Sequence, residues 1–283
     1  MSLPYYVDAV RRVFGEEDVA EASLRCGQFH DVLLTPTKVY RFPRNRSAAS
    51  RMAVRAEVLR VLSTLDLGVS TPQVLSVEDG ALPCLVISRV PGRPLERAEL
   101  ASPRAVERVA GQIAVLLGEL ERAGQDERVR DLVGLSSSDR WADFAEGVRR
   151  ELFPLMSPAG RQRAEAELVA VTGLDPVTSA LVHGDLGGEN VLWELGTGGP
   201  RLVGVVDWDE VSVGDPAEDL AAIAASYGEN LVRRVLQLRG MTGLSEHLDR
   251  IRTVQATFAL QQALSGMLDA DEAEVADGLG SYR

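Results

Sequence analysis

One stretch of the chain decides its fold: residues 181–193 read LVHGDLGGENVLW. Leu181-Val182 ends one predicted buried strand, and Val191-Leu192-Trp193 begins the next. Glycines in the loop between them let the backbone turn tightly and let a large ligand approach. Three polar residues of this loop can do chemistry: His183, Asp185 and Asn190. The stretch therefore predicts a functional loop between two strands.

The spacing within this loop is informative because Asp185 and Asn190 are five residues apart. The same spacing occurs in the protein-kinase catalytic loop, His-Arg-Asp-Leu-x-x-x-Asn. There the Asp accepts the proton of the substrate hydroxyl, and the Asn holds a magnesium ion. We therefore predict that Asp185 is the catalytic carboxylate and that Asn190 is a metal ligand.

A second carboxylate follows the next apolar segment, in which residues 205–209 read VVDWD. A glycine-rich turn separates this segment from the first, so the two strands are predicted to form a hairpin. Asp207 then corresponds to the kinase Asp that is the main ligand of the ATP-bound magnesium ion. Residues 214–219 read GDPAED, and Asp215 and Pro216 suit the start of a helix.

Taken together, these motifs resemble the aminoglycoside phosphotransferase family, which are small-molecule relatives of protein kinases. The residues that carry the resemblance are His-Gly-Asp at 183–185, Asn190, Asp207 and the Gly-Asp-Pro-x-x-Asp motif that ends at Asp219. The resemblance implies an α+β, protein-kinase-like two-lobe fold with a small β-rich N-lobe and a mostly helical C-lobe. It also implies structural support from His183 and from Asp219, which would brace the backbone of the catalytic loop.

Within that family, the chain looks closest to the subgroup that phosphorylates basic cyclic peptide antibiotics of the viomycin and capreomycin type. The stretches that carry this closer likeness are residues 27–30, 151–157, 182–194, 204–226 and 258–264. The likeness implies an ATP-dependent enzyme, with GTP as a possible alternative donor, that uses Mg²⁺, phosphorylates a hydroxyl and confers resistance.

The resemblance also implies where the nucleotide binds. Gly27 would belong to the loop that covers the phosphates, and the backbone at Ser88 and Val90 would contact adenine. On the third strand, Arg41 aligns with the kinase lysine that contacts the phosphates, with Arg44 and Lys38 as alternatives. Glu57 would pair with Arg41, although an exposed Glu among helix arginines is an equally good interpretation.

The amino-acid composition limits the kinds of partner and substrate that the protein is expected to bind. The 283 residues carry a net charge of −12, and 45% of them are hydrophobic. This charge disfavours nucleic acid as a partner and favours a cationic substrate. The acids predicted to hold that substrate are Asp209, Glu210, Asp269, Asp271 and Glu272. The C-terminal three have an alternative interpretation as a solvated helix face.

Neither a membrane span nor a signal peptide is predicted, and the two cysteines do not suggest a disulfide framework. We expect a cytoplasmic protein, monomeric or weakly dimeric. Residues 1–91 would form the nucleotide-binding lobe. Residues 92–283 would form the helical lobe, which would contain the catalytic hairpin and the substrate site, with Pro91-Gly92-Arg93-Pro94 at the boundary.

Hydrophobic periodicity predicts the secondary structure on either side of this boundary. In the N-terminal lobe, a helix over 47–62 is predicted to turn Arg55 away from Met52, Val54 and Leu59. In the C-terminal lobe, helices are expected over 105–123, 141–153, 160–171, 217–226, 230–238 and 244–268.

Two alternatives stay open at this stage. The acceptor could instead be an aminoglycoside, a macrolide or a small metabolite. Alternatively, the chain could be a pseudokinase-like protein that binds a nucleotide or a basic peptide without catalysis. The intact Asp185, Asn190 and Asp207 favour an enzyme.

Overall fold

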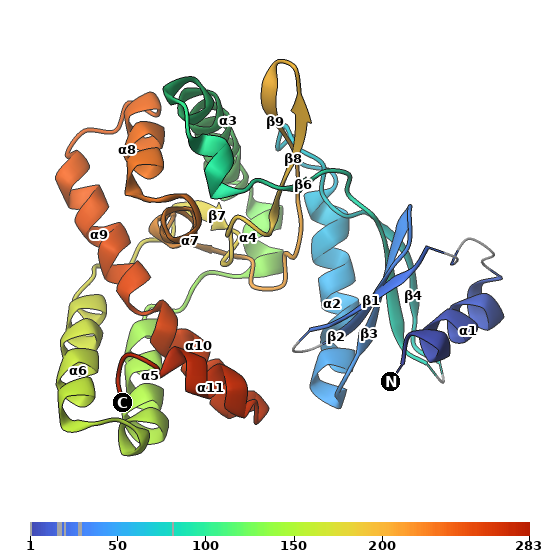
Figure 1. Ribbon diagram of the computed structural model, residues 1–283, viewed down its shortest axis with the longest axis horizontal. Coiled ribbons are helices and arrows are strands. Elements are labelled where there is room, and N and C mark those ends of the chain that lie inside the picture. Colours follow the sequence, from blue (N-terminus) through green and yellow to red (C-terminus); the bar gives the residue numbers. More distant parts are fainter. Residues whose placement is uncertain (1, 16–18, 20, 28–29, 81) are drawn as a thin grey trace. The chain divides into compact units, whose positions relative to one another are not determined.

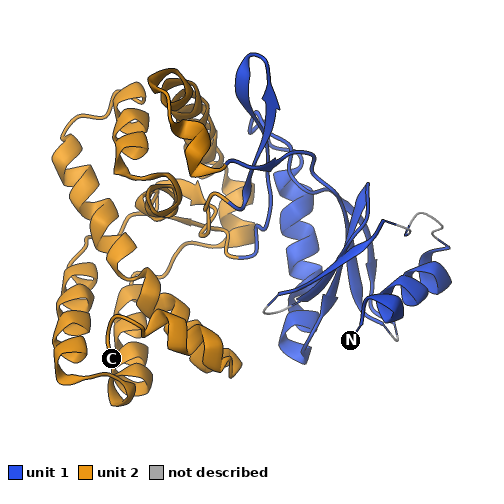
Figure 2. Ribbon diagram, in the orientation of Figure 1, with its two compact units in different colours: residues 1–95, 189–209 blue, residues 96–188, 210–283 orange. Residues whose placement is uncertain are grey.

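The computed structural model describes residues 2–15, 19, 21–27, 30–80 and 82–283. Residues 28 and 29 of the predicted phosphate-covering loop lie outside this described part. The chain divides into two compact units, drawn in Figure 2. The first comprises residues 1–95 and 189–209, and the second comprises residues 96–188 and 210–283.

The first unit is built on an antiparallel sheet with the strand order β1-β2-β3-β5-β4. Helices α1 and α2 pack against this sheet (Figure 1). The bounds are α1 Leu3–Phe14, β1 Ser23–Cys26, β2 His30–Leu34, β3 Lys38–Pro43, α2 Arg46–Leu62, β4 Val74–Glu78 and β5 Cys84–Ser88.

Alternation along β3 decides which side chains meet which helix, because successive side chains of a strand point to opposite faces. Tyr40 and Phe42 enter the apolar cluster that α1 covers, where the rings of Tyr6 and Phe42 stack with centroids 4.5 Å apart. Arg41 lies between them in sequence and therefore points to the other face. This is the face on which α2 places Arg55.

Helix α2 shows that one detail of the sequence prediction is wrong. Arg55 is buried, whereas Val54 is 58% exposed. The physical reason is the helical period: Met52, Arg55 and Leu59 follow one another at spacings of three and four and so share one stripe. Val54 lies off that stripe and faces solvent.

The predicted hairpin consists of β8 (Val191–Gly196) and β9 (Gly199–Val205), which pair antiparallel as expected. It joins the first unit through β6 (Arg93–Pro94), which pairs with β8, and through Ser70, which bonds to Val203 and Val205. Gly204 is required here because a Cβ would lie 2.2 Å from the Val90 side chain.

The second unit is mostly helical, with a two-stranded sheet formed by β7 and β10. The bounds are η1 Arg97–Leu100, α3 Pro103–Ala123, α4 Glu127–Val133, α5 Arg140–Gly147, η2 Val148–Leu152, η3 Phe153–Leu155, α6 Pro158–Thr172, β7 Ala180–Val182, β10 Ser212–Gly214, α7 Ala217–Tyr227, α8 Glu229–Leu238, α9 Leu244–Ala256, α10 Phe258–Asp269 and α11 Glu272–Gly278. None of the helices in the described part of the chain combines the length and apolar character that a membrane span requires.

Two helices of this unit differ from the sequence prediction. The predicted helix over 244–268 is two helices, α9 and α10, which meet at the buried Thr257. The Thr257 hydroxyl donates to the Val254 carbonyl oxygen and accepts from Gln261, so it satisfies polar groups at the break. The predicted helix over 141–153 changes to a π-helical turn, η2, after Gly147.

Candidate functional site

The predicted catalytic loop follows β7 in the second unit, and α7 holds it at both ends. At the start of the loop, Asp219 accepts hydrogen bonds from the backbone N–H groups of His183 (3.0 Å) and Gly184 (3.1 Å). At the far end, the Gly188 N–H donates to the Ser226 hydroxyl at 2.8 Å. Asp219 and Ser226 are seven residues apart, two helical turns, and therefore lie on one face of α7.

Sequence reasoning identified Asp219 but missed Ser226 and its neighbour Tyr227. The Tyr227 hydroxyl donates to the Gly188 carbonyl oxygen at 3.4 Å. A Cβ on Gly188 would lie 2.9 Å from that hydroxyl oxygen, so this close approach requires glycine. The missed signal was the seven-residue spacing from Asp219.

Asp185 itself is exposed, while His183 before it is fully buried. The Asp185 N–H donates to Nδ1 of His183 at 3.2 Å, so this ring nitrogen acts as an acceptor. Gly184 has φ +86°, and a Cβ there would lie 2.7 Å from the Glu210 carbonyl oxygen. Both facts explain why glycine separates the histidine from the aspartate.

Burial dominates the electrostatics of Asp219, whose side chain is enclosed by the loop that it supports. Burial raises the pKa of Asp219 to about 7, although the N–H groups of His183 and Gly184 oppose that shift. The neighbouring charges of Glu218 and Asp185 also raise this pKa.

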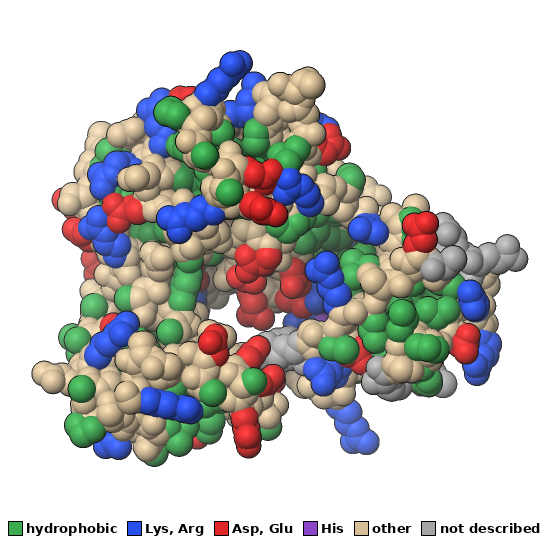
Figure 3. All heavy atoms as spheres, in the orientation of Figure 1, with side chains coloured by type: hydrophobic (Ala, Val, Ile, Leu, Met, Phe, Trp, Pro, Cys, Tyr) green, Lys and Arg blue, Asp and Glu red, His purple; other side chains and the backbone are tan. Residues whose placement is uncertain are grey.

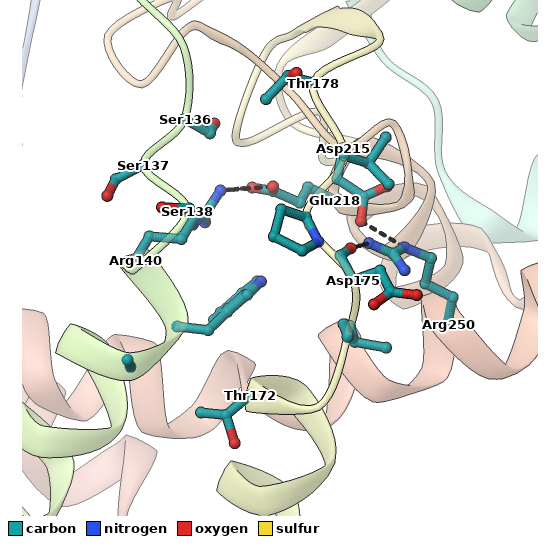
Figure 4. A pocket seen from close by; sticks show the side chains of 15 residues that line it. Ser136, Ser137, Ser138, Arg140, Thr172, Asp175, Thr178, Asp215, Glu218 and Arg250 are labelled. Atoms are coloured by element: carbon teal, nitrogen blue, oxygen red, sulfur yellow. Dashed lines mark hydrogen bonds and ion pairs between the residues drawn. The ribbon is translucent and has the colours of Figure 1, made fainter.

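Ion pairs fix the start of α7, as the close-up in Figure 4 shows. Asp215 caps the helix through the Ala217 N–H and accepts from Arg250 Nε at 2.6 Å. Arg250 also donates to the Asp175 carbonyl oxygen at 2.6 Å. On the other side, Arg140 Nη1 donates to Glu218 at 2.5 Å. These pairs line a small polar cavity of about 80 Å³ together with Ser136, Ser137, Ser138 and Thr178.

The second group of predicted residues belongs to the first unit, at the ends of the hairpin strands. Asn190 precedes β8, and Asp207 follows β9. The Val206 N–H donates to the Asn190 carbonyl oxygen at 3.0 Å, which brings these two segments together. Asp207 has φ +65°, a left-handed conformation that Asp tolerates better than most residues.

Two arginines surround the aspartates that follow β9. Arg41 contacts Asp209 in a bidentate manner, at 3.1 Å through Nη1 and 2.5 Å through Nη2, and Nη2 lies 3.4 Å from Asp207 Oδ1. Arg55 Nη1 lies 3.3 Å from Asp209 Oδ2. Burial by itself would raise the pKa of Asp209, but the charges of Arg41 and Arg55 outweigh it and lower that pKa below its ordinary value.

His30 lies between the two guanidinium groups, with Nδ1 3.4 Å from Arg41 and Nε2 3.4 Å from Arg55. Burial lowers the pKa of His30 to about 4, and the positive charge of Arg41 contributes to the same shift. The imidazole is therefore neutral near pH 7 and adds no third positive charge. Sequence reasoning assigned no role in the site to His30 or to Arg55.

The predicted pairing of Glu57 with Arg41 is wrong. Arg60 Nη1 donates to Glu57 at 3.2 Å, and the partners of Arg41 are Asp207 and Asp209. The reason is again the helical period, because Glu57 is two residues beyond Arg55 and points away from the face that meets Arg41.

Three further residues were expected to contact the nucleotide. Gly27 is exposed, and its carbonyl oxygen accepts from Arg44 at 2.8 Å. Ser88 ends β5, and its hydroxyl accepts from the Gln73 N–H at 2.9 Å. Val90 is buried against Leu192 and Val203.

The acids expected to bind substrate occupy different environments. Glu210, Asp269, Asp271 and Glu272 are all exposed. Figure 3 shows acidic side chains at the surface over α10 and α11. Asp271 also caps α11 through the N–H groups of Ala273 and Glu274. The Asp209 side chain, in contrast, is only 15% exposed and is engaged by two arginines.

Asn190 and Asp207 fit the ligand chemistry of magnesium. Mg²⁺ prefers oxygen ligands and is commonly held by one or two carboxylates together with substrate phosphates and water. An amide and a carboxylate at adjoining strand ends supply two such oxygen ligands. Among the described residues, no cluster of three or more His, Cys, Asp or Glu side chains has metal-binding geometry.

Comparison with known proteins agrees with this architecture. The sequence profile of the APH phosphotransferase enzyme family matches residues 29–253. Viomycin phosphotransferase from Streptomyces vinaceus is 53% identical over 281 residues, which cover 98% of this chain and 97% of the relative.

Solved structures share the fold at low sequence identity. The GDP and kanamycin complex of the phosphotransferase APH(2″)-IIIa superposes with a TM-score of 0.84 at 21% identity, covering 98% of this chain and 96% of that one. Macrolide 2′-phosphotransferase type I has a TM-score of 0.74 at 18% identity, covering 100% and 98%. The predicted kinase-like fold is confirmed, and the chain belongs to the APH phosphotransferase enzyme family.

Proposed function

We propose that this phosphotransferase transfers the γ-phosphoryl group of ATP or GTP to a hydroxyl of a viomycin-type basic cyclic peptide antibiotic, and so inactivates the drug. The observation that carries the proposal is the 53% identity to viomycin phosphotransferase over nearly the full length of both chains. The proposal extends to the resistance that such inactivation would confer.

Asp185 is assigned the role of general base. In this reaction the acceptor hydroxyl oxygen forms a bond to the γ-phosphorus, the bond to the β-phosphate oxygen breaks, and the nucleoside diphosphate leaves. The hydroxyl proton passes to the Asp185 carboxylate. Support comes from the exposed carboxylate on a loop that α7 holds at both ends. The transition state of phosphoryl transfer is loose, so positioning and electrostatics supply most of the acceleration.

Asn190 and Asp207 are assigned as the protein ligands of Mg²⁺. When bound with the nucleotide, this ion neutralises charge that develops on the phosphates. The hydrogen bond between Val206 and Asn190 keeps the two strand ends adjacent, which supports the assignment.

We assign capture of the cationic antibiotic to exposed acids of the second unit, namely Glu210, Asp269, Asp271 and Glu272. The charges of Asp271 and Asp269 contribute to raising the pKa of Glu274, after the larger effect of burial. A bound ammonium or guanidinium group would relieve that repulsion.

The test is mass spectrometry after incubation with ATP or GTP, Mg²⁺ and a panel of viomycin, capreomycin, kanamycin and a macrolide. We expect one added phosphoryl group on the cyclic peptides, and fragmentation would locate the modified hydroxyl. Asp185→Ala is the matched control for contaminating activity. Transfer only to kanamycin or the macrolide would discard the proposed acceptor. No transfer to any compound would discard the proposal as a whole.

A further inference from the structure

Arg41 is the residue that the family resemblance aligns with the phosphate-binding lysine of protein kinases, but its guanidinium group already contacts a carboxylate. Both of its terminal nitrogens contact the two carboxylate oxygens of Asp209, at 3.1 and 2.5 Å. The two side chains are only 12% and 15% exposed. A bidentate pair of this kind is strong and directional because each contact joins opposite charges.

Asp209 also holds a second arginine. Arg55 Nη1 lies 3.3 Å from Asp209 Oδ2, and its side chain is 10% exposed. One carboxylate therefore compensates two nearly buried guanidinium groups. Loss of the Asp209 charge would leave both arginines without their shared partner, which would let Arg41 move.

The same guanidinium group reaches the predicted metal ligand. Arg41 Nη2 lies 3.4 Å from Asp207 Oδ1, so this nitrogen contacts both Asp209 and Asp207. The Asp207 side chain is 52% exposed, in contrast to the nearly buried Asp209. Arg41 thus bridges one enclosed carboxylate and one that is open to solvent.

From this arrangement we infer that Asp209 is a positioning residue, which holds Arg41 against Asp207 so that Arg41 orients the metal-binding carboxylate instead of clamping the nucleotide phosphates. The inference rests on the proposed function, because it takes Asp207 as the Mg²⁺ ligand. It replaces the sequence-based assignments of Asp209 to the substrate and of Arg41 to the phosphates.

The identity of the basic residue is part of the argument. A guanidinium group is planar and presents several N–H donors in a fixed fork, so it can span two carboxylates. A lysine ammonium is a single point charge and cannot make the same bidentate contact. The arginine at this position therefore suits a role in which two carboxylates must be held together.

The experiment is an equilibrium titration of purified protein with ADP, in EDTA and at increasing Mg²⁺, for the wild type and Asp209→Asn. In EDTA we expect the ADP affinity of Asp209→Asn to stay within about twofold of that of the wild type. In Asp209→Asn, the Mg²⁺ concentration that gives half of the maximal gain in ADP affinity should rise by about 10–100-fold. Changes of this size are usual when a residue that supports a metal ligand is removed. Glu194→Gln is the control, because it also converts an acid paired with an arginine, Arg201, to its amide, but this pair lies at the surface.

Three outcomes would overturn the inference. Equal losses of ADP affinity in EDTA and in Mg²⁺ would mean that Asp209 and Arg41 act on the phosphates. An unchanged Mg²⁺ requirement would mean that Asp209 does not support the metal site. ADP binding by the wild type that is indifferent to Mg²⁺ would remove the metal site itself.

Arg41→Lys keeps the inference testable if Asp209→Asn does not fold. If Arg41 orients Asp207, the lysine variant should need more Mg²⁺ while its ADP affinity in EDTA stays the same. If Arg41 clamps phosphates, lysine should serve at least as well, and the Mg²⁺ requirement should not rise. These titrations contain no antibiotic, so failure of the proposed acceptor chemistry would leave their result intact.

Discussion

At the scale of single residues, the predicted catalytic loop combines an exposed acid with buried residues that bond to its backbone. Asp185 is exposed, whereas His183 and Asp219 are buried and hold the backbone around it. Changes at these positions should therefore have different consequences. Loss of the Asp185 carboxylate should affect turnover, and loss of the Asp219 charge should affect the stability of the fold.

Asp185→Ala is expected to lower kcat by about 10²–10⁴-fold, which is the usual contribution of a general base. ADP affinity should stay within about twofold of the wild type, because Asp185 is not assigned to the nucleotide. Steady-state kinetics and an ADP titration measure the two effects. Asp249→Asn, an exposed acid on α9, serves as the control. Near-normal turnover in Asp185→Ala would remove the general-base role.

Asp219 should make stability depend on pH. Its pKa is raised from 3.8 to about 7 in the folded protein. The folded state therefore binds more protons than the unfolded state between these values, and the contribution of Asp219 to stability is lost as pH rises through about 7. Relative to Asp219→Asn, the wild type should lose about 2–3 kcal/mol between pH 5 and pH 8. Denaturant unfolding at both pH values measures this, and parallel pH profiles for the two proteins would contradict it.

At the scale of elements, α7 supports the predicted catalytic loop through hydrogen bonds to both of its ends. Asp219 binds one end of the loop and Ser226 binds the other, two turns apart on the same helix face. The start of the helix is fixed in turn by the pairs of Arg250 with Asp215 and of Arg140 with Glu218. The position of the loop therefore depends on ion pairs that do not themselves contact it.

Arg250→Gln should loosen the start of α7. We expect it to lower the free energy of unfolding by about 1–3 kcal/mol, because Asp215 is nearly buried while Arg250 is partly exposed. It should also lower kcat more than it changes KM. Arg252→Gln is the matched control on the same helix, since its pairs with Glu229 and Asp249 lie at the surface. Equal effects of the two changes would contradict the special role of Arg250.

At the scale of the whole molecule, net charge matters most, because electrostatic attraction acts over a longer distance than any other interaction with a ligand. The net charge of −12 should attract a cationic antibiotic before any specific contact forms. Around α3, α8 and α9, acids and bases are interspersed in Figure 3 and paired, as in the contact of Arg234 with Glu107. Over α10 and α11, acids predominate at the surface.

Raising the ionic strength should therefore weaken capture of the antibiotic. Between about 0.05 and 0.5 M salt, we expect KM for the cationic acceptor to rise by about 3–10-fold with little change in kcat, because salt screens exposed charges. Steady-state kinetics at fixed Mg²⁺ and nucleotide measures this. Combined neutralisation of Asp269, Asp271 and Glu272 should flatten the salt dependence. An unchanged slope would remove these acids from the capture site.

Much of this protein was predictable from sequence alone because the relevant information is local. The hairpin of β8 and β9 follows from apolar runs around a glycine-rich turn, and the loop at 181–193 follows from its residue spacing. Helix boundaries were predicted within a few residues wherever apolar positions repeat regularly, as in α3. These motifs in order were also sufficient to predict the family, which sequence comparison confirmed.

Only the tertiary structure decided which side chains meet. Arg41 and Asp209 are 168 residues apart, and nothing in either local sequence specifies that they form a bidentate pair. The pairing follows from strand alternation, which points Arg41 toward α2, and from the attachment of the hairpin to the first unit through β6 and Ser70. Glu57, the partner suggested by the kinase pattern, is turned away by the helical period. Local sequence thus determined the elements and their motifs, whereas packing decided which charged side chains form ion pairs. The physical reason is that a buried ionised side chain is stable only where an opposite charge lies close to it.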